Sequence, residues 1–202
     1  TYTVPKDPQK IAVLSNSVLS MLYAVDGKAI SRVSTTDKLP PEIEALPALG
    51  QTANINMEQL LGLNPDVVLG LENQHKKYEA QLQSSKIPTV LIDYDGIKDN
   101  VPLLTFLGEL TNHQDKAKTV IATYENNIAK VKDAVKSQQP ARVAVLRATG
   151  KGVTAETDTA ITASMVKDLG MTNVVTSHLD KTTTDKTVPY SLETLAADNP
   201  DI

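Results

Sequence analysis

The chain lacks cysteine and tryptophan altogether, and it has no long apolar run. Without cysteine there can be no disulfide framework, iron–sulfur centre, thiolate zinc site or cysteine nucleophile. No stretch reaches the roughly 18 apolar residues that a membrane-spanning helix needs. The sequence opens at Thr1 on a polar stretch, so we expect any export signal to have been removed upstream of it.

An excess of positive charge is also missing. The 20 Lys and Arg residues face 24 Asp and Glu residues, which gives a net charge of −4, and no basic cluster stands out. Because binding to phosphate backbones needs concentrated positive charge, we predict no nucleic-acid partner. An apolar share of 41% over 202 residues is enough for a folded core and excludes disordered and collagen-like classes.

Short apolar runs alternate with amphipathic segments along the first half of the chain. We predict strands at 11–14, 30–33, 67–69 and 89–92, and helices at 18–24, 57–63 and 76–84. This alternation is typical of an α/β protein with a parallel, helix-covered sheet. The segment 38–50 contains three prolines and is expected to be a surface loop with one short helix.

A long helix is predicted from Gln114 to Ser137, because this stretch has no Gly or Pro and its apolar residues recur at three- and four-residue steps. Pro140 ends it, and an apolar strand at 142–146 then begins a second α/β part. We therefore expect an N-terminal lobe at 1–112, a connecting helix at 113–139 and a C-terminal lobe at 140–202.

An internal repeat supports two similar lobes. The segment from Met57 to Val67 recurs 135 residues later, from Leu192 to Ile202, and both copies contain Asn-Pro-Asp. In each copy we predict a helix, a turn in which Pro stops the helix, and a strand. The second copy stops where its strand should start, so the C-terminal lobe is expected to be incomplete in this chain.

The sequence resembles the class III solute-binding proteins of ABC importers for haem, iron–siderophores and cobalamin. The residues that carry the resemblance are the first strand, Pro47 to Gly50, Glu58 to Asp66, the long helix and Ala141 to Arg147; the segments 153–158 and 161–175 look most like the Gram-positive branch for haem and iron compounds. The resemblance implies two Rossmann-like lobes joined by a long rigid α-helix, with the ligand cleft between the lobes.

The resemblance also implies a function. The chain is expected to be a non-enzymatic substrate-binding component, without a catalytic cofactor, that captures haem or a ferric siderophore and delivers it to an ABC permease of the cytoplasmic membrane. It is expected to be monomeric, extracytoplasmic and lipid-anchored to the outer face of that membrane. A cobalamin-binding protein of the same fold is the alternative, followed by a nucleotide-binding α/β enzyme.

Candidate ligand-binding residues follow from the rule that open α/β sheets bind ligands beyond the carboxyl ends of their strands. Siderophore-binding relatives use Arg to meet anionic oxygens, which makes Arg147 the first candidate for an anion contact, although it equally fits an ordinary surface arginine. The full set of strand-end candidates is Ser15, Asn16, Ser17, Thr35, Leu71, Glu72, Tyr94, Arg147 and Thr149.

Haem ligation and permease docking are carried over from the family position by position. The family's axial Met falls on Ala53 here, which leaves Met21 as the candidate thioether, although the apolar residues around Met21 favour a core position over ligation. The family's acidic docking residue of the first lobe falls on Lys76 and Lys77 in this sequence. If the alignment is shifted by a few residues, Glu79 becomes the docking candidate. The simpler interpretation is that all these charged residues are solvated on a helix surface.

Two further motifs have simpler structural explanations. Gly150 to Ala155 matches the G-x-G-x-x-A pattern of nucleotide-binding loops, but no apolar helix follows at once, so a turn or hairpin is favoured. Ser164 to Lys167 spells S-x-x-K without the partner motifs of acyl-enzymes. The three histidines stand far apart, which predicts no metal site.

Overall fold

The computed structural model describes residues 3–150, 152–179 and 184–202. The chain divides into two compact units. The first contains residues 1–94 and 100–123, and the second contains 95–99 and 124–202. The division falls inside helix α7, Gln114–Val135, which is continuous over 22 residues.

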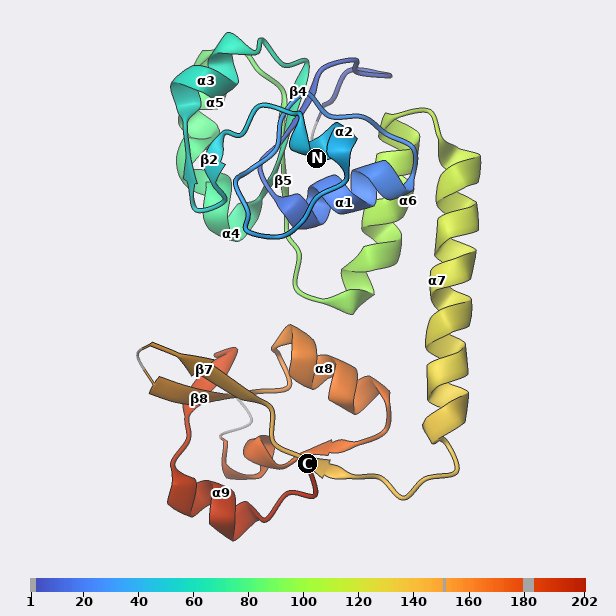
Figure 1. Cartoon of the computed structure of the whole chain (residues 1–202), viewed down its shortest axis with the longest axis vertical. Helices are drawn as coiled ribbons and strands as arrows, with labels where there is room; N and C mark the ends of the chain where they lie inside the picture. Colours follow the sequence, from blue (N-terminus) through green and yellow to red (C-terminus); the bar gives the residue numbers. More distant parts are fainter. Residues whose placement is uncertain (1–2, 151, 180–183) are drawn as a thin grey trace. The chain divides into compact units, whose positions relative to one another are not determined.

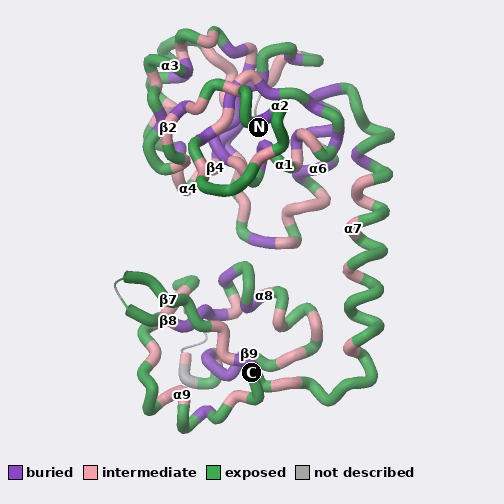
Figure 2. Tube along the Cα trace, viewed as in Figure 1, coloured by how far each residue is buried: buried purple, intermediate pink, exposed green. Residues whose placement is uncertain are grey.

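The first unit is built on a parallel sheet in the order β1-β4-β5, formed by Ile11–Val13, Val67–Leu71 and Thr89–Ile92 (Figure 1). These strands are almost continuously apolar because both faces of the sheet are covered, and Figure 2 shows buried residues along them. Successive side chains point to opposite faces. Ile11 and Val13 therefore belong to one apolar cluster, and Ala12 and Leu14 belong to another.

Helices pack on both faces. The cluster of Ile11 and Val13 includes residues of α1, Asn16–Ala24, and of α6, Asn100–Leu110. The other cluster includes Leu60 of α3, Met57–Gly62, and Leu82 of α5, Glu79–Ser84. The remaining short elements of this unit are α2 Pro41–Glu44, β2 Gly50–Gln51, β3 Asn54–Ile55, α4 Glu72–His75 and the 3-10 helix Lys76–Tyr78.

Two sequence predictions in this unit are wrong in detail. The segment 30–33 is not a ladder strand, because Ile30 bonds to the Ile11 carbonyl, Arg32 makes an isolated bridge with Ala48, and the Val13 amide donates to the Ser31 hydroxyl instead of to backbone. The helix predicted at 76–84 is divided into a 3-10 turn and α5, and α4 precedes it. Helix α6 was not predicted at all.

The second unit contains a parallel pair and an antiparallel sheet. Strands β6, Arg142–Val143, and β9, Thr172–Asn173, are parallel. Strands β7, β8 and β10, at Leu146–Thr149, Gly152–Glu156 and Thr187–Pro189, form an antiparallel sheet in the order β10-β8-β7. The strand predicted at 142–146 is thus split between two sheets. The other elements of this unit are the 3-10 helices Ile97–Asp99 and Val174–His178, α8 Ile161–Asp168 and α9 Leu192–Asp198.

The internal repeat is a structural repeat. Asn56 caps α3 by accepting from the Gln59 amide, and Ser191 caps α9 by accepting from the Thr194 amide. After each helix, an asparagine takes a left-handed conformation that its short polar side chain tolerates: φ is 50° at Asn64 and 43° at Asn199. Each Asn-Pro-Asp segment therefore begins with a left-handed asparagine, which is the C-cap residue of α9 and follows the C-cap residue Leu63 of α3.

Helix α7 has the apolar stripe that the sequence predicts, but the stripe is covered only near its start. Ala117 is buried, and Val120 and Ile121 pack against the core of the first unit. Further along, Val131 is 48% exposed. Within the described residues, no helix combines the length and apolar character needed to cross a membrane.

Candidate functional site

The parallel strands of the first unit place their carboxyl ends at one edge. The register pairs Val13 with Leu69, and Leu71 with Ile92, so the residues that follow β1, β4 and β5 gather along that edge. It is the edge at which open α/β sheets bind ligands. The structure thereby places six of the candidate residues at this edge: Ser15, Asn16, Ser17, Leu71, Glu72 and Tyr94.

The β1 end leads directly into α1. Ser15 is the extended N-cap residue and is buried, but its side chain makes no capping hydrogen bond. Asn16 Oδ1 is buried and has no hydrogen-bond partner, whereas Ser17 is exposed. Met21 is half-buried and packs against the apolar cluster around Ile11, which is the core position that its neighbours suggested.

At the β4 end, Glu72 begins α4 and forms an ion pair with Lys76 at 2.7 Å. Leu71 packs against the core. Thr35 lies on the loop after the segment 30–33, and its hydroxyl donates to Asp37 Oδ2 at 3.0 Å. These polar groups are engaged locally, so their contacts fix the loops.

At the β5 end, the Tyr94 hydroxyl donates to Asn100 Oδ1 at 2.6 Å, which ties the strand end to the first residue of α6. Tyr94 also packs against the core. Asp93, just before it, is exposed at the same edge. Sequence reasoning did not single out Asp93, although its position directly after the β5 strand was a usable signal.

In the second unit, Arg147 is engaged with a buried acid. Its guanidinium donates to Glu156 Oε1 at 2.9 Å from the neighbouring strand. Glu156 is only 4% exposed, and its Oε2 has no partner. The charge of Arg147 therefore compensates Glu156, so an anionic ligand would have to share it. Thr149 is exposed, and its hydroxyl donates to the Gly152 carbonyl.

The glycine pattern at 150–155 forms a hairpin. Thr149 pairs with Gly152, and Ala148 pairs with Val153, in antiparallel register. Gly152 has a φ of 128°, which other residues rarely adopt. Because β8 follows and not a helix, no helix N-terminus is available here to hold a pyrophosphate, and the nucleotide interpretation of this motif is wrong.

A hollow of about 370 Å³ lies in the second unit, between the segment 95–99 and the region around α8. Asp95, Lys98, Asp158 and Ser164 are among the residues that line it. The Lys186 ammonium donates to Asp95 Oδ1 at 2.8 Å, and this hydrogen bond, together with the nearby charge, holds the pKa of Asp95 below its ordinary value. Asp158 accepts from the Asn173 amide.

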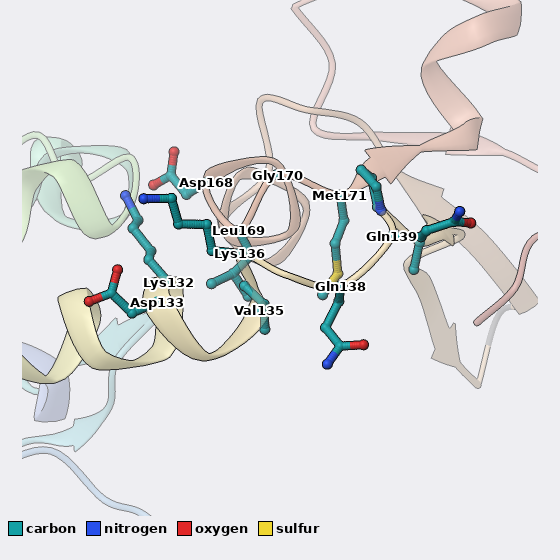
Figure 3. Close-up of a pocket in the computed structure, with 12 residues that line it drawn as sticks. Lys132, Asp133, Val135, Lys136, Gln138, Gln139, Asp168, Leu169, Gly170 and Met171 are labelled. Atoms are coloured by element: carbon teal, nitrogen blue, oxygen red, sulfur yellow. The ribbon is translucent and has the colours of Figure 1, made fainter.

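A larger pocket of about 680 Å³ lies where α7 ends (Figure 3). Its lining includes Lys132, Lys136 and Asp168, together with Ala141 and Met171, which immediately precede β6 and β9. It therefore lies at the amino ends of the parallel pair, opposite to the edge at which such sheets bind ligands. We do not assign the ligand to it. Among the described residues, no group of His, Asp and Glu is arranged to hold a metal ion.

Sequence reasoning missed the β2–β3 hairpin and the buried histidine beside it. His75 is 0% exposed, and its ring nitrogens contact the backbone of Leu71 and Thr52. The only sequence signal for His75 was its position one helical turn after the β4 end.

The docking candidate Glu79 is half-buried in the first turn of α5.

Both units are built from strands and helices, as in an α/β protein. The chain belongs to the periplasmic binding protein family, which matches residues 11–202. It is 28% identical to a vitamin B12-binding protein of Pectobacterium atrosepticum, over 69% of this chain and 51% of that protein. It is also 28% identical to a probable siderophore-binding lipoprotein, YfiY, of Bacillus subtilis, over 71% of this chain and 46% of that protein.

The solved structures agree with the fold. The haem complex of IsdE from Staphylococcus aureus superposes with a TM-score of 0.79 at 21% identity, over 96% of this chain and 73% of that one. The α/β fold expected from the resemblance is thus confirmed. The chain matches about half the length of these two curated relatives.

Proposed function

We propose that this chain is part of the substrate-binding component of an ABC importer that captures a metal chelate: a ferric siderophore, haem or cobalamin. The observation that carries the proposal is the family match over residues 11–202, and relatives named for vitamin B12 and siderophore binding support it. Polar residues at the carboxyl ends of β1, β4 and β5 fit such a role, because loops at that edge can vary with the ligand.

Among these chelates, the described residues favour a ferric siderophore over haem. Haem needs an axial donor such as Met, His or Tyr. Met21 packs against the core, both ring nitrogens of His75 are engaged, and the Tyr94 hydroxyl donates to Asn100. The family's axial position holds Ala53. The oxygen-rich strand ends instead suit hydrogen bonding to an oxygen-rich chelate. Cobalamin stands as the alternative, supported by the relative named for vitamin B12 binding.

The proposed role is non-catalytic, and the relatives named as binding proteins support that. The proposed location is outside the cytoplasm with a lipid anchor, which the lipoprotein name of the Bacillus relative supports. The proposed partner is a membrane permease, contacted in part through Glu79.

A four-chelate panel tests the ligand. The natural full-length protein is titrated by calorimetry with ferric enterobactin, ferrioxamine B, haemin and cyanocobalamin, and NAD serves as the control. We expect one ferric siderophore to saturate at one equivalent and NAD to give no heat. Saturation by haemin with a shifted Soret band, or by cyanocobalamin, would overturn the siderophore assignment but keep the importer role.

A further inference from the structure

The β2–β3 hairpin is held by side chains from one short neighbouring segment. Three residues of 75–78 reach across to consecutive parts of its backbone. The contacts are His75 Nε2 with the Thr52 carbonyl at 2.8 Å, the Lys77 ammonium with the Ala53 carbonyl at 2.6 Å, and the Ile55 amide with the Tyr78 hydroxyl at 2.9 Å. Each partner on the hairpin is a main-chain atom, so the hairpin's own side chains are not used.

The hairpin needs this support because its own ladder is very short. Only Gly50 with Ile55, and Gln51 with Asn54, pair across it. A ladder of this length is not stable by itself in water. The ties from 75–78 fix the backbone of the tip, while Gln51, Ala53 and Asn54 stay exposed. A fixed backbone with exposed side chains is suited to contacting another molecule.

His75 connects this hairpin to the main sheet. Its Nδ1 accepts from the Leu71 amide at 2.8 Å, so Nδ1 carries no proton, and Nε2 donates to the Thr52 carbonyl. The ring lies close against β4, because a Cβ on Gly70 would meet the His75 Cβ and Nδ1 at 3.1 Å. One buried neutral ring thus joins the carboxyl end of β4 to the hairpin tip.

We propose that His75 is a positioning residue that holds the hairpin tip and the β4 end together as one preformed wall of the ligand site. The role of this wall rests on the proposed function, since the β4 end is part of the edge assigned to the ligand. His75 does not touch the ligand, because it is buried and both ring nitrogens are engaged. The contacts come from the exposed side chains that it positions.

The surroundings of His75 make this arrangement sensitive to pH. Burial lowers the pKa of His75 below its ordinary value, with the charge of Lys77 adding to the effect and the hydrogen bond to the Thr52 carbonyl opposing it. The ring of Tyr78 stacks at 6.4 Å, and Glu72 and Lys76 neutralise each other. The hairpin, β4 and β5 carry no titratable side chain. A proton on Nδ1 would remove the acceptor for the Leu71 amide and so break the hydrogen bond between His75 and the end of β4.

The test uses the natural full-length protein and three variants. His75→Asn keeps an acceptor near the Leu71 amide but is too short for Thr52. His75→Gln has an amide that can reach Thr52, and His113→Asn is the control at an exposed histidine. Hydrogen exchange of the ligand-free proteins is followed at residues 50–56. We expect His75→Asn to exchange at least about tenfold faster there, His75→Gln to recover part of the protection, and His113→Asn to match the wild type.

Affinity is then measured between pH 8 and pH 5.5 with the chelate of the panel that saturates the wild type: ferric enterobactin, ferrioxamine B, haemin or cyanocobalamin. We expect His75→Asn to bind at least about tenfold more weakly at pH 8. The wild type and His113→Asn should weaken more steeply than His75→Asn as pH falls, because only these two proteins carry a His75 ring that can be protonated. The chelate's own protonation affects all three equally. A merely structural His75 would change stability without changing this slope.

Three results separate the possible failures. Unchanged exchange at 50–56 in His75→Asn overturns the positioning role. Faster exchange with unchanged affinity and an unchanged pH slope overturns the claim that the hairpin is part of the site. Absence of binding by the wild type overturns the proposed function, while the exchange data still decide whether His75 positions the hairpin. If His75→Asn does not fold, Lys77→Ala serves as the second variant, because it removes the exposed hydrogen bond to the Ala53 carbonyl. Unchanged exchange at 50–56 and unchanged affinity in Lys77→Ala would contradict the proposal that the fixed hairpin is part of the ligand site.

Discussion

The Asp66 carboxylate accepts a hydrogen bond from the Lys10 backbone amide at 2.9 Å, and the same oxygen accepts from the Gln9 amide. The relationship recurs in the second unit, where Asp201 accepts from the Arg142 amide at 2.8 Å. In both units the aspartate amide also donates back, to the carbonyl of Lys10 or Arg142. The last residue of each Asn-Pro-Asp therefore fixes the start of a strand: Asp66 holds the start of β1, and Asp201 holds the start of β6.

Asp66→Ala should lower the free energy of unfolding by about 1.5–3 kcal/mol, because two backbone amides lose a charged acceptor. Urea denaturation of the variant and the wild type measures it. Glu58→Ala in the same repeat is the control, since Glu58 is exposed. Equal midpoints for Asp66→Ala and the wild type would show that the repeat's aspartate does not hold the strand.

The sequence predicted much of the first unit, because the sheet strands are short apolar runs buried on both faces. It failed where side chains replace backbone partners. The Ser31 hydroxyl accepts the hydrogen bond from the Val13 amide that a backbone carbonyl of a neighbouring strand would otherwise accept. The side chains of His75 and Tyr78 hold a hairpin that has only two paired positions of its own. Such contacts join residues far apart in the sequence, so no local pattern indicates them.

The same limit applies to the candidate site. Strand-end positions such as Ser15 and Glu72 follow directly from the parallel topology. The pairing of Arg147 with Glu156 does not, because it requires the antiparallel register of β7 and β8, and the sequence suggested one strand at 142–146. A charged residue at a strand end can be predicted from sequence, but its partner cannot.

Arg147→Ala should destabilise the fold by about 1–3 kcal/mol, because it leaves the Glu156 carboxylate buried without its counter-charge. Adding Glu156→Gln should restore most of the loss, since the amide is neutral. Thermal unfolding of the single and double variants measures the coupling. If the double variant is no more stable than Arg147→Ala, Arg147 does not serve to compensate Glu156.

Tyr190 should stay protonated where ordinary tyrosines ionise. Its hydroxyl donates to the Asp198 carboxylate, and burial together with that neighbouring negative charge raises its pKa to about 12. A raised pKa means that the folded state retains the proton, so this contribution to stability is complete below pH 10 and is lost as pH rises toward 12.

Tyrosinate absorbance measures this directly. At about pH 11, Tyr190→Phe should show the same ionised absorbance as the wild type, because Tyr190 contributes none there. A lower ionised absorbance in Tyr190→Phe than in the wild type would contradict the raised pKa.

Glu79→Gln should reduce chelate uptake by cells severalfold without changing the affinity of the purified protein, if Glu79 meets a basic residue of the permease. Glu42→Gln, at an exposed acid in α2, is the matched control and should import normally. Uptake of radioactive iron chelate, measured beside calorimetric affinity, separates the two effects. Normal uptake by Glu79→Gln would remove it from the docking surface.

The central claim is that the protein captures a metal chelate, and calorimetric titration of the natural full-length protein tests it most directly. We expect ferric enterobactin or ferrioxamine B to bind at one equivalent with a Kd of about 1 μM or tighter, and the same siderophore without iron to bind more weakly. Failure of both siderophores, haemin and cyanocobalamin to saturate the protein would contradict the claim.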